Sequence, residues 1–154
     1  MIKVLFVCHG NICRSTMAEF LFKYMVEKEG IADKFVIASA ATSREEIGNP
    51  VHPGTRKKLE PLGINVAGKK AVQITEKDMD YYDYILIMDD NNKQNLIRMF
   101  GVSCLSKVYR LLDFTDNPQN IADPWYTGDY DTAFEDIYSG CTAFLCYLKK
   151  EEKI

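Results

Sequence analysis

The chain has 154 residues, a net charge of −3 and 47% hydrophobic residues, and these values exclude several classes of protein. Its longest unbroken apolar run, from Ala143 to Leu148, is far shorter than the roughly 18 residues of a membrane-spanning helix. A small acidic excess with no strongly basic half argues against nucleic acid as a partner. We expect one domain over residues 1–154, with no contact to membrane or nucleic acid and no need for a metal or disulfide to fold.

The N-terminal residues and the cysteines indicate the compartment. Only five apolar residues, Val4 to Cys8, follow Lys3, whereas a secretory signal needs a longer apolar segment. The five cysteines are an odd number in a chain of ordinary size, which favours reduced thiols over a disulfide framework. We expect a cytoplasmic monomer.

Strands and helices are predicted to alternate along the chain. Four short apolar segments are predicted strands, at residues 2–7, 35–40, 84–88 and 108–112. Two shorter helices are predicted at residues 52–62 and 91–100. The last helix is predicted from one apolar stripe that comprises Phe134, Ile137, Tyr138, Cys141, Phe144, Leu145 and Leu148. Residues 41–51 and 115–131 are predicted to be long loops.

The first helix is predicted to begin at Thr16 and to stop at Gly30. Thr16 and Glu19 have the spacing of a capping box. Glu19, Lys23 and Glu27 are predicted to form a charged ladder on one face. The predicted core positions on another face are Met17, Leu21, Tyr24 and Met25.

Alternating strands and helices imply right-handed βαβ units with a parallel sheet covered by helices on both faces. In such sheets, ligands bind where the loops gather at the carboxyl ends of the strands. The informative loops should therefore follow Val7, Ala40, Met88 and Leu112.

The loop after the first strand has the spacing C-x5-R-S and carries the strongest chemical pattern. Its residues are Cys8, His9, Gly10, Asn11, Ile12, Cys13, Arg14 and Ser15. Backbone N–H groups in a tight loop at a helix N-terminus bind anions, and Gly10 and Asn11 are best able to take the left-handed angles such a loop requires. A cysteine there has its thiolate stabilised and can act as a nucleophile. Arg14 can hold two phosphate oxygens at once, and Ser15 can donate its hydroxyl to the sulfur.

This pattern predicts phosphoryl transfer through a phosphocysteine, with no cofactor. A simpler interpretation is that Cys8 ends a buried strand and Arg14 opens an exposed helix. A metal site formed by Cys8, His9 and Cys13 is a further alternative, but the chain has no second cluster to complete it, and its only other histidine is His52.

At this point the sequence resembles the low-molecular-weight protein tyrosine phosphatase family. The segment VLFVCHGNICRSTMAE is similar to the family's N-terminal motif, SAATS and IGNP to its second loop, and DPWY to its acid loop. The resemblance runs over essentially the whole chain. It implies a flavodoxin-like three-layer α/β sandwich with a four-stranded parallel sheet, and metal-free hydrolysis of phosphotyrosine in proteins and of small aryl phosphates.

The resemblance also implies roles for residues outside the first loop. Asp123 becomes the general acid of the first step and the base of the second, although its Asp-Pro sequence alone predicts only a turn. Asp116 is a bystander that can serve as a control. Trp125 and Tyr126, otherwise core aromatics, line a slot for a flat phenyl ring together with Ile12. Ser39, otherwise a polar residue at a strand end, is expected to bond near Asn11 and support the loop.

Two cysteine roles are expected. Cys8, as an exposed thiolate, is open to oxidation to a sulfenic acid, and Cys13 can trap that product as a reversible disulfide. Cys141 is expected to be a small core residue. Neither Cys104 nor Cys146 is given a role.

Two departures from the family pattern concern rate and substrate preference. Glu45 stands where many members carry an aromatic residue on the rim of the slot. In addition, residues 68–72 lack the histidine that many members use to support the loop asparagine.

Three rival functions remain open. A thioredoxin-linked arsenate reductase needs two further cysteines after the third strand, and residues 88–92 contain none. A phosphoarginine phosphatase has threonine in place of Ile12 and a less aromatic acid loop. A module that only binds phosphotyrosine would normally lack the nucleophile or the acid.

Overall fold

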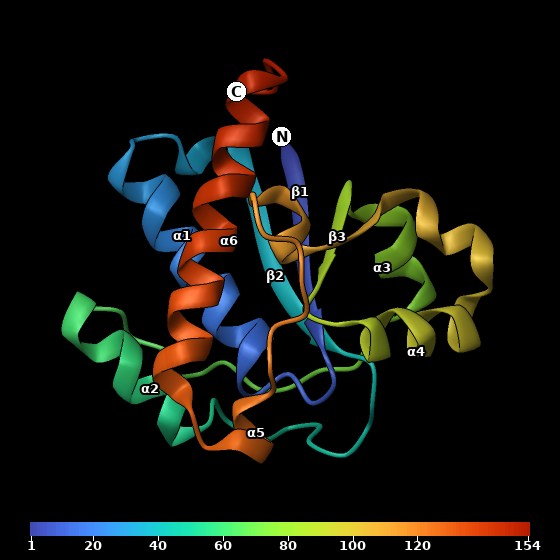
Figure 1. The fold of residues 1–154 in the computed structure, drawn as a ribbon, viewed down its shortest axis with the longest axis horizontal. Helices are drawn as coiled ribbons and strands as arrows, with labels where there is room; N and C mark the ends of the chain where they lie inside the picture. The colour runs from blue at the N-terminus through green and yellow to red at the C-terminus, as the bar shows by residue number, and fades with distance from the viewer.

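The computed structural model describes all 154 residues and contains one four-stranded parallel sheet. Its strands are β1 (Ile2–Cys8), β2 (Phe35–Ala41), β3 (Tyr84–Ile87) and β4 (Val108–Arg110), in the order β2-β1-β3-β4 (Figure 1). The order reverses between β1 and β3, as it does in flavodoxin-like folds. The predicted fold class is therefore confirmed.

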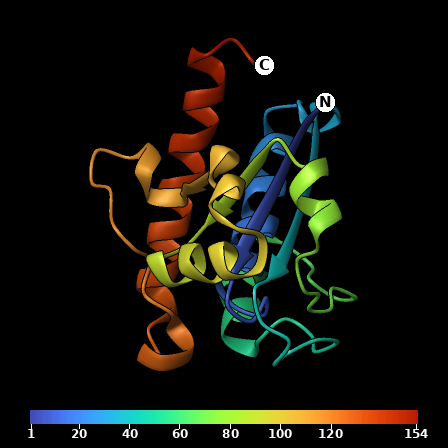
Figure 2. The ribbon, with the colours of Figure 1, turned by 90° about the vertical axis from the view of Figure 1, so that its right-hand side faces the viewer.

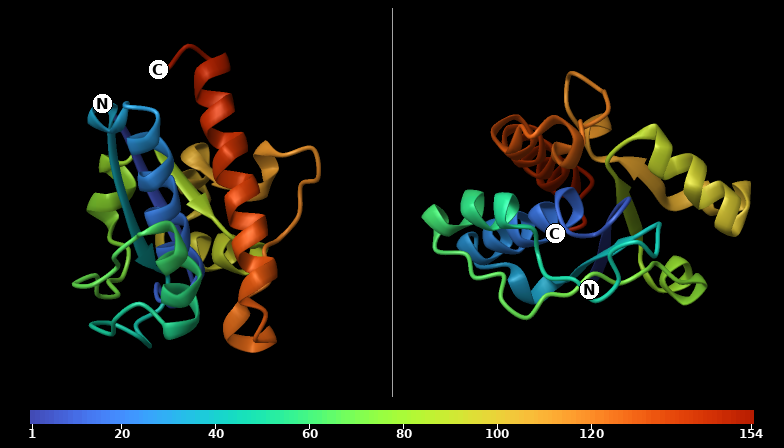
Figure 3. Two further views of the ribbon diagram at one scale, coloured as in Figure 1. Left: turned by 90° about the vertical axis from the view of Figure 1, so that its left-hand side faces the viewer. Right: turned by 90° about the horizontal axis from the view of Figure 1, so that it is seen from below.

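Helices cover both faces of the sheet, giving three layers (Figures 1 and 3). On one face, α1 (Arg14–Lys28) and α6 (Tyr130–Lys150) pack on Val4 and Phe6, with α2 (Pro53–Leu59) beside them. On the other face, Leu5 and Val7 pack against α3 (Glu76–Tyr81) and α4 (Asp90–Phe100). Alternate residues of β1 thus enter opposite cores, which explains why this strand is apolar from Val4 to Cys8.

Short elements account for most differences from the sequence-based prediction. The fourth strand stops at Arg110 and continues as the 3-10 helix η4 (Leu111–Phe114). The predicted loop at 115–131 contains the one-turn helix α5 (Pro124–Thr127) and the start of α6, and α3 was not predicted at all. Three further 3-10 helices are η1 (Ala32–Lys34), η2 (Glu60–Leu62) and η3 (Val102–Lys107). Helices of one or two turns leave too little periodicity to be detected.

The predicted start of α1 is wrong. The helix begins at Arg14, and its N-cap residue, Cys13, makes no side-chain capping bond. The Thr16 hydroxyl donates to the Cys13 carbonyl instead of capping a helix. Glu19 pairs with Lys23 at 2.6 Å, as the predicted ladder requires, but it does so as a buried residue. The core positions also differ. Met17 and Leu21 are buried as predicted, Phe22 and Val26 join them, and Tyr24 and Met25 are only half-buried, because α1 is packed between the sheet and α6.

The stripe of α6 is narrower than predicted. Ile137, Cys141, Phe144, Leu145 and Leu148 are buried as expected. Tyr138 is 47% exposed and stacks on Phe134, so it does not belong to the core.

The two chain termini lie at the same end of the molecule, and the carboxyl ends of β1 and β2 lie at the opposite end (Figures 1 and 2). The long α6 spans most of the distance between the two ends (Figure 2). None of the helices combines the length and the apolar composition that crossing a membrane requires.

Candidate active site

The loop between β1 and α1 lies at the point where the strand order reverses. Asn11 has a φ of 61°, in the left-handed region that asparagine tolerates better than most residues. Its backbone N–H points back into the loop and donates to Cys8 Sγ at 3.3 Å. Gly10 does not have a positive φ, so only one of the two residues expected to take left-handed angles does so.

Cys8 lies on the wall of a pocket of about 80 Å³. The pocket is lined by Cys8, His9, Gly10, Ile12, Cys13, Glu45, Glu46, Asp123, Trp125 and Tyr126. Cys8 is only 3% exposed, which corrects the expectation of an exposed thiolate. Its sulfur is accessible from this pocket rather than from an open surface.

Three polar side chains behind Cys8 hold the loop in place. Ser15 Oγ lies 3.0 Å from Cys8 Sγ, so the predicted contact is present, with the thiol as the donor. The Asn11 amide donates to Ser15 Oγ at 2.8 Å and to Ser39 Oγ at 2.9 Å, which confirms the expected contact between Ser39 and Asn11. The N–H of Val72 donates to Asn11 Oδ1 at 3.1 Å. A backbone group therefore supports the loop asparagine in a segment that lacks the family's histidine.

Arg14 is fixed beside the loop and is 2% exposed. Its Nη1 donates to Asp89 Oδ2 at 2.6 Å and to the Ile121 carbonyl at 2.7 Å, and its Nη2 lies 3.3 Å from Asp123 Oδ2. Burial works against the charge of Arg14, but the neighbouring Cys8, Asp89 and Asp123 outweigh it and raise its pKa above the ordinary value. The buried Nε has no hydrogen-bond partner in the protein. The guanidinium is therefore charged and oriented, and its Nε remains free to donate.

Sequence analysis missed Asp89. This residue caps α4 through Oδ1, which accepts from the N–H of Asn92 at 2.8 Å, while Oδ2 holds Arg14. A sequence signal existed, because Asp89 directly follows Met88, the end of the third predicted strand, where ligand-binding loops were expected.

Asp123 lies on the same pocket as Cys8. Its Oδ1 accepts from the N–H of Trp125 at 3.0 Å and so caps α5, while Oδ2 faces Arg14. Asp116 is exposed and lines a separate groove beside α6, which suits it as a control.

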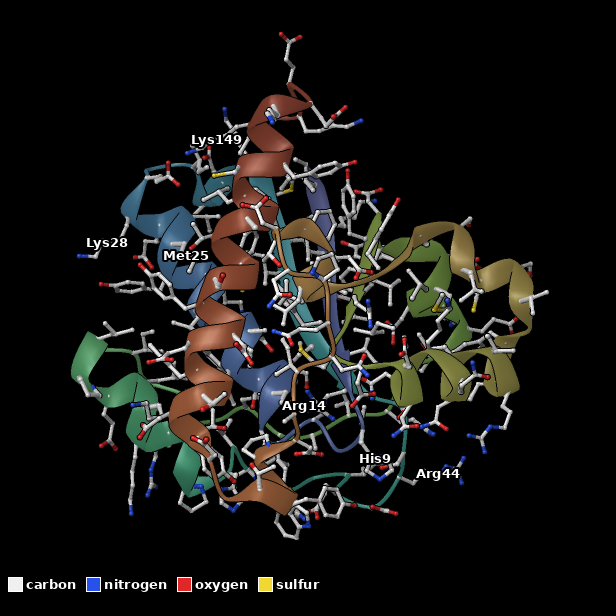
Figure 4. All side chains as sticks on the ribbon, in the orientation of Figure 1. His9, Arg14, Met25, Lys28, Arg44 and Lys149 are labelled. Carbon is white, nitrogen blue, oxygen red and sulfur yellow. The ribbon has the colours of Figure 1, made fainter.

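The rim of the pocket carries aromatic and acidic side chains. Trp125 and Tyr126 are 55% and 78% exposed, and with Ile12 they line the pocket as predicted. Glu45 also lies there, and its carboxylate is 2.9 Å from His9 Nε2, a contact that the sequence did not reveal. Figure 4 shows His9 and Arg44 at the loop end of the molecule, with Arg14 further inside and Lys149 near the opposite end.

Cys13 shares the pocket with Cys8 and is buried. Burial raises the pKa of its thiol to about 11, against a smaller opposing effect of the Tyr130 hydroxyl 3.5 Å away. Cys141 is fully buried in the core, as expected, whereas Cys104 and Cys146 lie outside this pocket. No group of three or more histidine, cysteine, aspartate or glutamate side chains is placed to hold a metal ion.

Comparison with known proteins agrees with this geometry. Residues 3–154 match the model of the family described as low molecular weight phosphotyrosine protein phosphatase. The low molecular weight protein-tyrosine-phosphatase YfkJ of Bacillus subtilis is 40% identical over 156 residues, which cover the whole of both chains. Its crystal structure superposes with a TM-score of 0.93 at 42% identity, over 98% of this chain and 96% of that one.

Two more distant relatives are informative. The human low molecular weight phosphotyrosine protein phosphatase is 38% identical over 147 residues, 92% of each chain. The YwlE arginine phosphatase, solved as a cysteine-to-serine mutant with a phosphorylated active-site serine, is 27% identical and has a TM-score of 0.84 over 99% of each chain. The fold and these matches define a phosphatase. The chain belongs to the low molecular weight protein tyrosine phosphatase family.

Proposed function

We propose that the protein hydrolyses phosphotyrosine in proteins, and small aryl phosphates, through a phosphocysteine formed on Cys8. The observation that carries this proposal is the pocket lined by Cys8 and Asp123, with the buried guanidinium of Arg14 held against the Asp123 carboxylate. The arginine phosphatase relative, which carries a phosphorylated active-site serine in a cysteine-to-serine mutant, supports a covalent intermediate. Residues 1–154 are proposed to act as one phosphatase domain.

In the first step, the Cys8 thiolate attacks phosphorus, the S–P bond forms and the P–O bond to the tyrosine breaks. Arg14 holds two phosphate oxygens, and the loop N–H groups hold the rest of the developing charge. The leaving phenolate takes a proton from Asp123. Asp123 contacts Arg14 through Oδ2. A bound phosphate takes over the guanidinium and so releases Asp123 for this step.

In the second step, Asp123 is the base. It takes a proton from a water molecule, whose oxygen attacks phosphorus while the S–P bond breaks, so that phosphate leaves and the Cys8 thiolate is restored. Ser15 donates its hydroxyl to the sulfur and so makes the thiolate a better leaving group. Asp89 keeps Arg14 oriented through both steps.

The pocket favours phosphotyrosine by its depth and its walls. Cys8 is buried, so a phosphate must be carried inward on a long, flat group, and the shorter phosphoserine does not reach it. Ile12, Trp125 and Tyr126 offer apolar surface to a phenyl ring. An arsenate reductase of this fold is disfavoured because Cys104 lies outside the pocket, in a depression between α3 and η3.

The test is a substrate panel with a metal chelator present throughout. It compares phosphotyrosine, phosphoserine and phosphoarginine peptides with thioredoxin-dependent reduction of arsenate. We expect hydrolysis of phosphotyrosine above all, abolished in Cys8→Ser and severely impaired in Arg14→Lys, since a point charge does not replace the planar fork. Preference for phosphoarginine, arsenate reduction, loss of activity with chelator, or turnover by Cys8→Ser would overturn the proposal. Cytoplasmic location and the monomeric state stay predictions.

A further inference from the structure

A buried glutamate on α1 has no part in the chemistry described above. The Glu19 side chain is 5% exposed, and carboxylates are rarely buried so deeply unless they are paired. Lys23 Nζ lies 2.6 Å from its Oε2, and Lys69 Nζ lies 3.6 Å from its Oε1. Oε1 also accepts a hydrogen bond from the Ser39 hydroxyl.

Ser39 connects this carboxylate to the nucleophile. Hydrogen bonds link Glu19 with Ser39, Ser39 with Asn11, Asn11 with Ser15, and Ser15 with Cys8 Sγ. All five residues are buried, so no solvent molecule competes for these groups. Such a chain has a direction, because each hydroxyl has only one hydrogen to donate.

Glu19 fixes that direction. An ionised carboxylate only accepts, so the single hydrogen of Ser39 must point to Glu19, and Ser39 Oγ must accept from the Asn11 amide. The N–H of Val72 holds Asn11 Oδ1, so the amide NH2 group faces both serines. Ser15 Oγ then accepts from Asn11, and its own hydrogen is available to the Cys8 sulfur, 3.0 Å away, once the thiol has given up its proton.

Lys69 binds the end of the hydrogen-bond chain that is most distant from Cys8. Its Nζ donates to the Ser39 carbonyl at 3.0 Å, and its side chain is 16% exposed. Burial lowers the pKa of Lys69, and the nearby Glu19 carboxylate opposes that change. A cation at this position pairs with the Glu19 carboxylate and holds the backbone of Ser39 next to it.

We propose that Glu19 and Lys69 are positioning residues, which direct this buried hydrogen-bond chain so that the Ser15 hydroxyl donates to the Cys8 thiolate. The proposal rests on the proposed function, in which Cys8 is the nucleophile. Neither residue touches the substrate. Their effect is on how readily Cys8 ionises and how well it leaves in the second step.

The experiment measures ionisation of Cys8 without turnover. Alkylation of Cys8 by iodoacetamide is followed by mass spectrometry as a function of pH in the wild type, Glu19→Gln, Ser39→Ala, Lys69→Met and Lys69→Arg. Lys70→Met is the matched control, since Lys70 is exposed and adjacent in the chain. We expect the alkylation midpoint to move to higher pH in Glu19→Gln and Ser39→Ala, with about a tenfold slower reaction near pH 6, because a hydrogen bond to a charged group is weakened. Lys69→Met should shift in the same direction, Lys69→Arg should restore most of the rate, and Lys70→Met should match the wild type.

The direction in which Glu19→Gln changes the alkylation rate of Cys8 distinguishes the hydrogen-bond chain from a simple electrostatic effect. Removing a negative charge near a thiolate would by itself make Cys8 ionise more readily and react faster near pH 6. A faster or unchanged reaction in Glu19→Gln, or a loss of thermal stability with the wild-type pH profile, overturns the proposal. If Glu19→Gln fails to fold, Ser39→Ala, which changes no charge, decides by the same criterion. Alkylation of Cys8 does not require phosphatase activity. Turnover by Cys8→Ser would therefore contradict the proposed function, while the alkylation profiles would still test the roles of Glu19 and Lys69.

Discussion

The two carboxylate oxygens of Asp123 have separate tasks. Oδ1 caps α5 and Oδ2 faces Arg14. Asparagine is as good an N-cap residue as aspartate, so Asp123→Asn removes the acid while leaving the cap in place. We expect kcat for aryl phosphates with poor leaving groups to fall by about 10²–10⁴, with a much smaller loss for good leaving groups that need no proton.

A series of substituted phenyl phosphates measures this dependence, and thermal unfolding checks that the cap is intact. Asp116→Asn, in the separate groove beside α6, should behave as the wild type. Equal losses across the whole series would assign the acid to another residue.

Cys13 is a thiol at neutral pH because burial raises its pKa to about 11. Only its thiolate can attack a sulfenic acid on Cys8, forming the S–S bond and releasing hydroxide. The thiolate fraction rises about tenfold per pH unit below the pKa, so disulfide formation after a peroxide pulse should accelerate from neutral pH towards pH 11. Cys13→Ser should keep most activity in reductant and recover poorly after peroxide. An oxidised wild type that contains no Cys8–Cys13 disulfide by mass spectrometry would rule out this role.

The raised pKa of Cys13 also makes the stability of the folded protein depend on pH. The folded protein favours the neutral thiol, so this contribution is complete below the ordinary pKa of 9.0 and is lost as the pH rises through about 11. Cys13→Ala should therefore remove part of the decline in stability over that range.

Glu45 replaces an aromatic residue on the rim with a carboxylate. It forgoes stacking worth about 0.5–1.5 kcal/mol and adds screened repulsion below about 1 kcal/mol towards a phosphate. Glu45→Trp should therefore raise kcat/KM for aryl phosphates several-fold. In the wild type, peptides with basic residues beside phosphotyrosine should be preferred, and added salt should narrow that preference. If the substitution and the salt leave both quantities unchanged, Glu45 has no influence on substrate binding.

At the scale of elements, α6 packs closely on η4 through Gly140. A Cβ added at Gly140 would lie 2.5 Å from Leu111 Cγ, well inside contact distance. Overpacking of this kind costs about 1–3 kcal/mol, against a gain of about 1 kcal/mol for alanine over glycine in a helix. We expect Gly140→Ala to lower Tm by a few degrees, while Ser139→Ala, one residue away and exposed, leaves Tm nearly unchanged. A rise in Tm for Gly140→Ala would show that η4 moves aside freely.

Elements were predictable from the sequence where burial dictates composition. All four strands were found, and the signal is clearest for the central strands β1 and β3, because parallel strands buried on both faces must be largely apolar. Local polar signals were less reliable. Thr16 and Glu19 have the spacing of a capping box, yet Glu19 bonds to Ser39, twenty residues away, whereas a real capping box at Thr75 and Asp78 begins the helix α3 that went unpredicted. A tertiary partner overrides a local capping preference.

At the scale of the whole molecule, the site depends on contacts between distant loops. Arg14 bonds to Asp89, 75 residues away, and to Asp123, 109 residues away. The spacing in the first loop predicted the roles of Cys8 and Arg14, and the family resemblance predicted that of Asp123, because these motifs are local. The resemblance gave no indication of Asp89 or Lys69. The fold, and not the spacing along the chain, determines which side chains of different loops come into contact.

The central claim is that phosphate is carried on Cys8, and trapping the intermediate tests it most directly. The wild type and Asp123→Asn, whose second step lacks its base, are mixed with a good-leaving-group aryl phosphate, quenched in acid and digested for mass spectrometry. We predict one phosphoryl group on the peptide that contains Cys8, attached to sulfur and more abundant in Asp123→Asn. Continued turnover with no phosphate on Cys8, or phosphate attached to another residue, would contradict the mechanism.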